Sequence, residues 1–581
     1  MRVSYDKKGN RGRVDDAPLS LMQTARHDLA GFFAKGRMFT FNNSTRAWRR
    51  MAELVGEEHI PAAVLGSLAP EPVPEAIRAM LEDGYVYARE PRQHQQDGFE
   101  QTRDWAVAAL LMDAGTGKTK VALDTAAYLW GKGEINLVIV VAPSGVQFKW
   151  IDQEVPNDVP SWCPLKASAH STSTLKDAAE LIRNAIISGE PYLLAVNTEM
   201  LSNERAVATL LSLIETNRVL IIFDESTRFK NISSARGHNA ILLARRCAYV
   251  RILTGTPVTR HVDDLYGQLK LLSDSVAGET TISGFKARFC EVDPNYKTVI
   301  GSRNLDDLLD ALAKVSFMAS KEDCLDLPPK TWLERAVKLT DEQRTHYNAL
   351  LKHLVTTLRD GHELTVSNVL AQMVRLQQVC SGFLINPETK VVDELACKPR
   401  LDAVEEVASE LRGKLVVWCQ FRHETERLTR ELKKMGLRVG RYDGSVSPAE
   451  RHAILTAFQR TDELDCLVAT MSSGGIGLDM TAASDALYYS HTFNAEIRWQ
   501  SEARLDRIGQ TRAVCYHDLV APGTVDRRII TNVREKRVVA GIVGQGVKDR
   551  LSMILAADPR SSELVAGPDR QCLIDFLQDV E

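Results

Sequence analysis

The 581-residue sequence lacks a long apolar run and any arrangement of cysteines typical of a metal site or a disulfide framework. Its first ten residues, MRVSYDKKGN, are polar and have no signal-peptide core, and runs such as LVIVVA and VLIIF are too short to span a bilayer. The ten cysteines are irregularly spaced, without a Cys-x-x-Cys pair, which favours free thiols in a reducing compartment. We therefore expect a cytoplasmic protein that has no membrane association.

The sequence also lacks an excess of positive charge. Its formal net charge is −4, which excludes a chain-wide basic coat for nucleic acid. Any contact with nucleic acid must come from a local group of lysines and arginines. The length suits two large domains with additions.

Short apolar runs alternate with amphipathic stretches in two separate blocks, which predicts two α/β units with parallel sheets. The expected strands of the first block are 137–142, 192–196, 219–223 and 250–253. Those of the second block are 414–418, 437–442, 466–470, 486–490 and 514–520. Between the blocks, residues 341–380 are expected to be helical, and the prolines in 327–330 predict an extended linker.

A glycine-rich loop in the first block has the sequence MDAGTGKT, residues 112–119, between an apolar run and a helix-forming run. In a strand–loop–helix context, Gly115, Thr116 and Gly117 can present backbone N–H groups to phosphate. Lys118 can reach the β- and γ-phosphates of ATP, and the Thr119 hydroxyl can bind Mg²⁺. The usual motif begins with glycine, and this sequence has Met112 in its place.

Two adjacent acids, Asp224 and Glu225, end the apolar run VLIIF about a hundred residues after the loop. Strand ends of a parallel sheet face the ligand crevice, so Asp224 is expected to hold Mg²⁺ and Glu225 to polarise the attacking water. Taken alone, such a pair is more often a solvated strand end. Its position after a phosphate loop favours the catalytic interpretation.

Two arginines of the second block, Arg504 and Arg507, lie three residues apart and are expected on one face of a helix. They can act as arginine fingers on the γ-phosphate if the two lobes close. The alternative is a solvated helix face that makes surface ion pairs.

Taken in order, these motifs resemble helicase superfamily two, and within it the compact bacterial or viral Swi/Snf-type DNA-dependent ATPases. The resemblance runs from about residue 89 to about residue 530 and rests on segments of distinctive sequence. These are PRQHQQDGF, VVAPSGVQFKWIDQE, DESTRFKN, LTGTP, LDLPPK, ATMSSGGIGLDM and QSEARLDRIGQ. Thr227 stands where the family has histidine, and the basic patch before the linker is reduced to Lys321.

The resemblance implies two tandem RecA-like domains with helical insertions between them and a small N-terminal extension. The implied divisions are an accessory region, lobe 1, a linker with helical protrusions, lobe 2 and a C-terminal tail: 1–86, 87–272, 273–397, 398–545 and 546–581. The cofactors would be ATP and Mg²⁺, and the expected setting is a bacterial or virus-infected host cytoplasm. No chromatin-reader domain is recognisable.

Further site residues follow from the resemblance alone. Gln95 would read the adenine base, and Gln500 would join Arg504 and Arg507 in the catalytic set. Contacts with DNA phosphates are implied for residues of three loops: Ser144, Thr198, Ser472, Gly474 and Gly475. The expected partner is double-stranded or branched DNA, bound by a monomer.

Three functions stay open at this point. The first is an ATP-dependent double-stranded DNA translocase acting on naked, forked or protein-bound DNA in replication, recombination or repair. The second is a strand-separating DNA or RNA helicase, and the third is a nucleic-acid-binding scaffold that hydrolyses nothing. The first 86 residues are either a DNA-binding accessory domain, using residues such as Phe39, Phe41 and Trp48, or a packing extension.

Overall fold

The computed structural model describes the chain from residue 73 to residue 535 with short gaps, and parts of the segment before it. The gaps are 259–260, 294–298, 360–365, 387–388, 390, 412 and 475–478, and the earlier described ranges are 2–6, 11–18, 20–22, 25, 33–35, 37–42, 51 and 54–61. Residues 1–324 and 325–538 belong to two separate compact units. No helix of the described ranges is long and apolar enough to cross a membrane.

The N-terminal segment contains a small antiparallel sheet, with strand order β1-β2-β4-β3. Its strands are β1 Arg2–Asp6, β2 Arg11–Asp15, β3 Phe33–Lys35 and β4 Met38–Asn42. Val3, Val14 and Phe39 form its core with Met51 and Ile60. Phe39 is therefore unavailable for stacking on a base, and Trp48 lies outside the described residues.

Lobe 1, which we define as residues 87–324, is built on a seven-stranded sheet in which every pairing is parallel. Its strand order is β13-β5-β10-β9-β6-β8-β7. The strands are β5 Val107–Met112, β6 Leu137–Ala142, β7 Lys166–His170, β8 Tyr192–Asn197, β9 Val219–Asp224, β10 Tyr249–Thr254 and β13 Ser316–Ala319. The four strands predicted for this block are confirmed.

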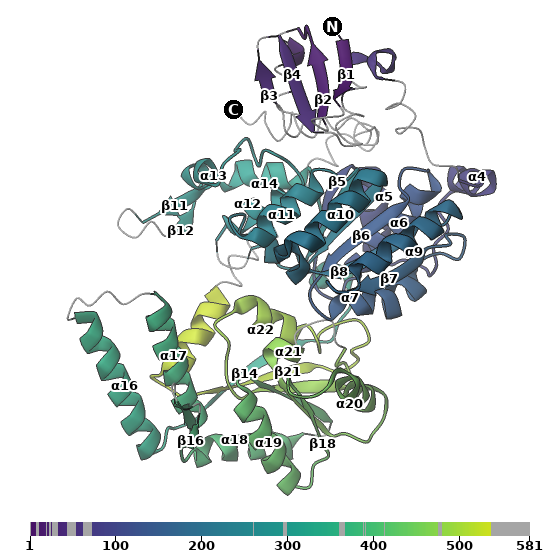
Figure 1. The fold of residues 1–581 in the computed structure, drawn as a ribbon. Helices are drawn as coiled ribbons and strands as arrows, with labels where there is room; N and C mark the ends of the chain where they lie inside the picture. The colour runs from purple at the N-terminus through teal and green to yellow at the C-terminus, as the bar shows by residue number, and fades with distance from the viewer. Residues whose placement is uncertain are drawn as a thin grey trace. The chain divides into compact units, whose positions relative to one another are not determined.

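Helices cover both faces of the lobe 1 sheet (Figure 1). Alternate residues of each central strand enter opposite cores: Ile139 and Ile221 pack in one, Val140 and Ile222 in the other. The helices are α5 Gln93–Thr102, α6 Lys118–Gly131, α7 Val146–Lys149, α8 Val155–Asp158, α9 Leu175–Ile187, α10 Glu204–Thr216, α11 Ala235–Ala244, α12 Asp264–Leu269, α13 Ile282–Phe289, α14 Leu305–Ala313 and α15 Lys321–Cys324. The π-helical turn η2 Trp150–Glu154 and the 3-10 turns η3 Thr198–Ser202 and η4 Ser226–Phe229 complete the helical elements, and β11 Cys290–Val292 pairs with β12 Val299–Ser302. Continuous apolar strands are thus buried on both faces, as a parallel sheet requires.

Lobe 2, which we define as residues 325–535, has a six-stranded parallel sheet with the order β14-β21-β20-β17-β19-β18. Its strands are β14 Lys330–Ala336, β17 Lys414–Cys419, β18 Val439–Tyr442, β19 Cys466–Thr470, β20 Ala483–Tyr488 and β21 Val514–Val520. Its helices are α18 Lys398–Glu410, α19 Arg422–Lys434, α20 Pro448–Arg460, α21 Met471–Gly474 and α22 Ala495–Glu502. The prediction of two parallel α/β sheets is confirmed.

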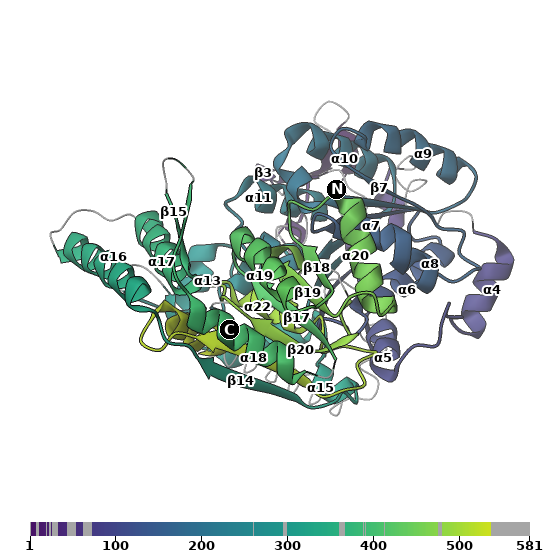
Figure 2. The ribbon, with the colours of Figure 1, turned by 90° about the horizontal axis from the view of Figure 1, so that it is seen from below.

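A helical hairpin extends from lobe 2, and both views show it beside the sheet (Figures 1 and 2). It consists of α16 Asp341–Arg359 and α17 Val366–Ser381, followed by the pair β15 Phe383–Ile385 and β16 Val392–Glu394. Helices were predicted across 341–380. The range 273–397, expected to be linker and protrusions, also contributes one edge strand to each large sheet, β13 and β14. Edge strands need less apolar sequence, and β14 is largely exposed.

Candidate nucleotide-hydrolysis site

The phosphate loop of lobe 1 connects the buried strand β5 to the first turn of α6. Gly115 and Gly117 have φ angles of 90° and 94°, a left-handed conformation that residues with a Cβ rarely adopt. The Thr116 backbone N–H and hydroxyl both donate to the Asp113 carbonyl, at 3.2 and 2.8 Å. Lys118 begins α6, so the N–H groups and positive dipole end of that helix lie at the loop, as an anion site requires.

Met112 replaces the first glycine of the usual loop without disturbing it. The residue ends β5 and is fully buried in the core on the α6 side of the sheet. The turn begins only after it, so this position needs no left-handed conformation.

Gln95 of α5 packs directly on the phosphate loop. Its Nε2 donates to the Thr116 carbonyl at 2.9 Å, and its Oε1 accepts from the Arg92 backbone N–H at 3.0 Å. A Cβ on Gly117 would lie 2.2 Å from Gln95 Nε2, so this glycine also permits the close approach. Gln95 therefore joins α5 to the loop, and its role in reading the base stays a prediction.

The acidic pair and the phosphate loop lie at the same edge of the sheet. Strand β10 separates β5 from β9, and its Leu253 pairs with Asp224 while its Thr254 pairs with Leu111. The carboxyl ends of β5 and β9 are therefore one strand apart. This is the arrangement in which a loop can hold phosphates while acids from the neighbouring strand end reach Mg²⁺ and water.

Asp224 is buried and fixed by two hydrogen bonds. The Trp150 indole N–H donates to Oδ2 and the Glu225 backbone N–H donates to Oδ1, both at 3.0 Å. Burial, and next the Glu225 charge, raise the pKa of Asp224 to about 6, against the opposing effects of Lys118 and the Trp150 hydrogen bond. A buried carboxylate with a raised pKa gains stability from a nearby cation. With the Thr119 hydroxyl, it offers the hard oxygen ligands that Mg²⁺ prefers, so the residues present fit the expected cofactor.

Glu225 has a φ of 52°, an uncommon conformation for a residue with a side chain. Such conformations cost about 1–3 kcal/mol and persist where surrounding contacts hold them. Trp150 was recognised in the sequence only as part of a family segment. No local signal could have shown that its indole binds Asp224, because the two are 74 positions apart.

The segment Leu253–Pro257, LTGTP in the sequence, passes next to the phosphate loop. A Cβ on Gly255 would lie 2.9 Å from the Ala114 backbone nitrogen and 3.2 Å from the Met112 carbonyl oxygen. Only glycine allows this approach. The segment therefore touches the loop on one side and continues toward α12 on the other.

The arginines of lobe 2 differ from the prediction in one respect. Helix α22 ends at Glu502, so Arg504 and Arg507 lie in the following turns and not on one helical face. The Arg504 carbonyl accepts from the Met480 backbone N–H at 3.1 Å, and Gln510 Nε2 donates to the Ala483 carbonyl at 2.8 Å. These tertiary hydrogen bonds outweigh the local helical tendency. Gln500 does lie on α22, where its amide donates to Glu496 at 3.4 Å.

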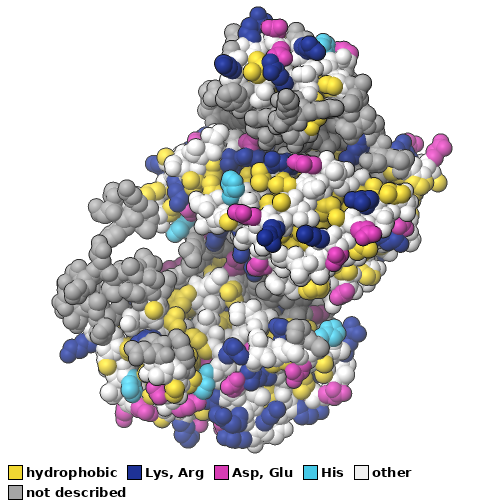
Figure 3. Space-filling model, in the orientation of Figure 1, with side chains coloured by type: hydrophobic (Ala, Val, Ile, Leu, Met, Phe, Trp, Pro, Cys, Tyr) yellow, Lys and Arg dark blue, Asp and Glu magenta, His cyan; other side chains and the backbone are white. Residues whose placement is uncertain are grey.

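The expected DNA-contact residues follow the carboxyl ends of strands. Ser144 is exposed after β6, and Ser472 is exposed on α21 after β19, with Gly474 at the end of that helix. Thr198 follows β8 but is fully buried, which disagrees with a contact between its side chain and phosphate. Gly475 lies outside the described residues. On the face drawn in Figure 3, Lys and Arg side chains are interspersed with Asp and Glu.

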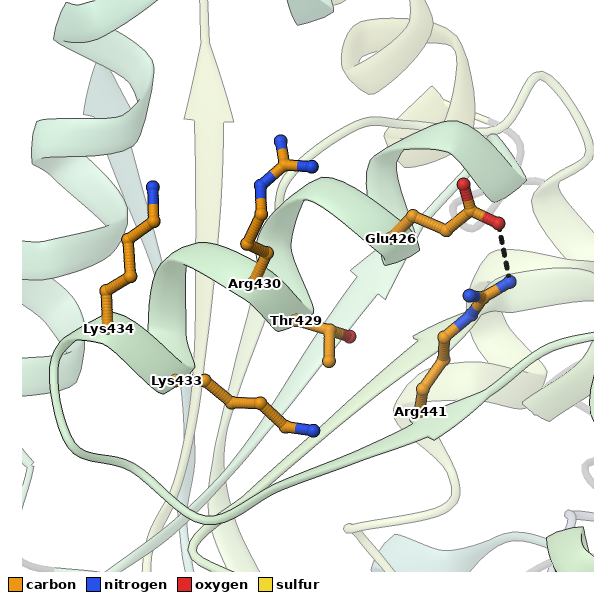
Figure 4. A pocket seen from close by; sticks show the side chains of 6 residues that line it. All are labelled: Glu426, Thr429, Arg430, Lys433, Lys434 and Arg441. Atoms are coloured by element: carbon orange, nitrogen blue, oxygen red, sulfur yellow. Dashed lines mark hydrogen bonds and ion pairs between the residues drawn. The ribbon is translucent and has the colours of Figure 1, made fainter.

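A hollow of about 460 Å³ lies on lobe 2 beside α19 and β18 (Figure 4). Its lining residues are Glu426, Thr429, Arg430, Lys433, Lys434 and Arg441. Carboxylates balance most of its cations. Arg441 pairs with Glu426 at 2.9 Å and with Asp443 at 2.6 Å, and Glu431 holds both Arg430 and Lys434. We assign no ligand to this hollow.

Comparisons with known proteins identify the family. The SNF2-related domain matches residues 94–382, and the helicase conserved C-terminal domain matches residues 399–509. The chain is similar to a SWI/SNF-related matrix-associated actin-dependent regulator of chromatin subfamily A-like protein 1 of Xenopus tropicalis, at 24% identity over 89% of this chain and 54% of that protein. It is also 24% identical to the DNA annealing helicase and endonuclease ZRANB3 of Bos taurus, over 82% of this chain and 42% of that protein.

A solved structure, the Sulfolobus solfataricus SWI2/SNF2 ATPase core in complex with dsDNA, matches 83% of this chain and 98% of its own, with 21% identity and a TM-score of 0.37. The chain spans about half the length of the curated relatives named above. The two family models match in sequence order: the first covers lobe 1 and continues through α17 of lobe 2, and the second lies within lobe 2. The chain therefore belongs to the SNF2-related, Swi/Snf-type ATPases of helicase superfamily two.

Proposed function

We propose that this protein is an ATP-dependent double-stranded DNA translocase that hydrolyses ATP to ADP and phosphate. The observation that carries the proposal is the position of Asp224 and Glu225, one strand away from the phosphate loop at the same edge of one sheet. Such a site binds a nucleoside triphosphate and hydrolyses it. Membership of the SNF2-related family supports DNA as the activator of that hydrolysis.

The chemistry is divided among residues of lobe 1. Lys118 and the backbone N–H groups of the loop hold the β- and γ-phosphates. Thr119 and Asp224 would hold Mg²⁺, which when bound neutralises charge on the phosphate oxygens. Glu225 accepts a proton from the attacking water.

Lobe 2 completes the reaction in this proposal. Arg504 and Arg507 stabilise charge on the γ-phosphate when the lobes close, and Gln500 assists them. Closure and reopening then advance the lobes along a duplex, gripped through phosphates near Ser144, Ser472 and Gly474. Similarity to a DNA annealing helicase and endonuclease, ZRANB3, supports DNA as the substrate. The setting that we propose is naked, forked or protein-bound DNA in replication, recombination or repair.

The test is an ATPase panel with no nucleic acid, single-stranded DNA, duplex DNA, forked DNA and RNA, with Glu225→Gln as the inactive control. We expect duplex DNA of any sequence to stimulate hydrolysis, and added salt to weaken the stimulation steeply because contacts go to phosphates. Equal stimulation by RNA would indicate the RNA helicase. Absence of hydrolysis with every nucleic acid would indicate a binding scaffold.

A second assay separates movement from strand separation. A translocase displaces a third strand from a triplex while leaving the duplex paired, whereas a helicase releases a strand of the duplex itself. ATP-dependent triplex displacement without release of the duplex strands is the expected result. Release of single strands from a blunt duplex would contradict the proposal and favour a strand-separating helicase.

A further inference from the structure

Gln268 of α12 is a buried polar residue that joins two parts of the nucleotide site. It is 1% exposed. Its Oε1 accepts a hydrogen bond from the Ser226 hydroxyl at 2.9 Å, and its Nε2 donates to the carbonyls of Pro257 and Asp264, at 2.6 and 2.9 Å. Ser226 follows Glu225 directly, and Pro257 ends the segment that touches the phosphate loop.

The helix that carries Gln268 packs closely on the backbone that follows the acidic pair. A Cβ on Gly267 would lie 2.4 Å from the Lys230 carbonyl oxygen, so α12 can approach only because this residue is glycine. The Lys230 ammonium also pairs with Asp264 at 3.2 Å. Both ends of the turn η4 are therefore held by α12, and Gln268 contacts the end nearest Glu225.

These contacts form a continuous path. The phosphate loop touches Gly255, the same segment reaches Pro257, and Gln268 connects Pro257 to Ser226. Glu225 stands next on the chain in its left-handed conformation, which persists only where the surroundings hold it. Thr227, the residue after Ser226, is also buried.

We propose that Gln268 is a positioning residue that fixes Glu225 relative to the phosphate loop and transmits movement of the Leu253–Pro257 segment to it. An amide suits this role because its oxygen and nitrogen can bind a hydroxyl donor and a carbonyl acceptor at the same time. A buried network that is fully satisfied is rigid, and one deprived of a partner is not. The inference rests on the proposed ATPase function and adds a residue that acts through Glu225.

The test replaces Gln268 with methionine, which keeps the length of the side chain and removes its hydrogen bonds. We expect kcat with duplex DNA to fall by about tenfold to a hundredfold, the scale of a small misplacement of a reacting group. The dissociation constant of a fluorescent ATP analogue should stay unchanged, because the phosphate loop is intact. Ser226→Ala should lower kcat similarly, and the double variant should be no slower than Gln268→Met, as for residues that act through one contact.

Gln343 of α16 supplies the matched control. It is also 1% exposed, its Nε2 donates to the Val379 carbonyl at 2.7 Å, and its Oε1 accepts from the Thr340 N–H at 3.0 Å, all within lobe 2. Gln343→Met should lower the melting temperature about as much as Gln268→Met does, yet leave kcat unchanged. If Gln268 has a purely structural role, both variants should have a lower melting temperature and an unchanged kcat.

The outcomes separate the two proposals. A wild-type kcat in Gln268→Met and Ser226→Ala, beside an active wild-type chain, overturns the role of Gln268 and leaves the proposed function standing. A wild-type chain that hydrolyses no ATP with any nucleic acid overturns both. If Gln268→Met does not fold, the smaller change Ser226→Ala decides by the same criterion.

Discussion

Replacing Trp150 with phenylalanine should change the pH dependence of hydrolysis in a defined direction. The substitution keeps an aromatic ring in the core and removes the indole N–H that donates to Asp224 at 3.0 Å. That hydrogen bond stabilises the ionised carboxylate and lowers its pKa, while burial and the Glu225 charge raise it to about 6. Without the donor, the pKa of Asp224 should rise further.

The magnitude follows from the loss of a hydrogen bond to a charged group. Such bonds contribute about 1.5–3 kcal/mol, and about 1.4 kcal/mol corresponds to one pKa unit, so the pKa of Asp224 should rise by roughly one to two units. Only the ionised carboxylate can hold Mg²⁺. Activity should therefore be lost as pH falls through the pKa of Asp224, near 6 in the wild type and near 7 or above in Trp150→Phe.

The assay is kcat/KM for ATP as a function of pH at subsaturating Mg²⁺, because this parameter reports ionisations of the free enzyme. Trp162→Phe is the matched control, since its indole donates to the Val86 carbonyl at 2.8 Å and not to the acidic pair. Its acid limb should stay at the wild-type pH. An unchanged acid limb in Trp150→Phe, or one displaced to lower pH, would refute the assignment of Asp224 as the ligand whose charge Trp150 stabilises.

Two further predictions test the catalytic residues. Glu225→Gln should bind ATP normally and lose turnover, because an amide cannot accept a proton from water; steady-state hydrolysis near the wild-type rate would show that Glu225 is not the base. Arg507→Ala should bind ATP nearly normally while DNA-stimulated turnover falls by roughly a thousandfold, the scale of a lost arginine finger. A surface ion pair would instead contribute at most about 1 kcal/mol of stability, so normal turnover in Arg507→Ala would remove the basis for coupling hydrolysis to lobe closure.

The sequence alone was sufficient to predict elements whose pattern is carried by consecutive residues. The strands Leu137–Ala142 and Cys466–Thr470 agree with the predicted ranges at both ends, because a strand buried on both faces must be continuously apolar. The phosphate loop could also be predicted from the sequence. Its turn needs the positive φ angles of Gly115 and Gly117, so glycines must stand at these positions. The edge strand β14, Lys330–Ala336, could not be predicted in this way, because it is largely exposed and carries no apolar run.

Only the tertiary structure decided which side chains meet. Sequence spacing predicted Arg504 and Arg507 on a helix, whereas hydrogen bonds of Arg504 with Met480 and of Gln510 with Ala483 hold that segment in turns. The contacts of Asp224 with Trp150 and of Ser226 with Gln268 join residues 74 and 42 positions apart. The sequence by itself determined the parallel sheets and the loop that can receive phosphate, because backbone conformation and apolar burial are local demands. The partners of each buried polar group depend on how separate elements pack, and no local pattern encodes that.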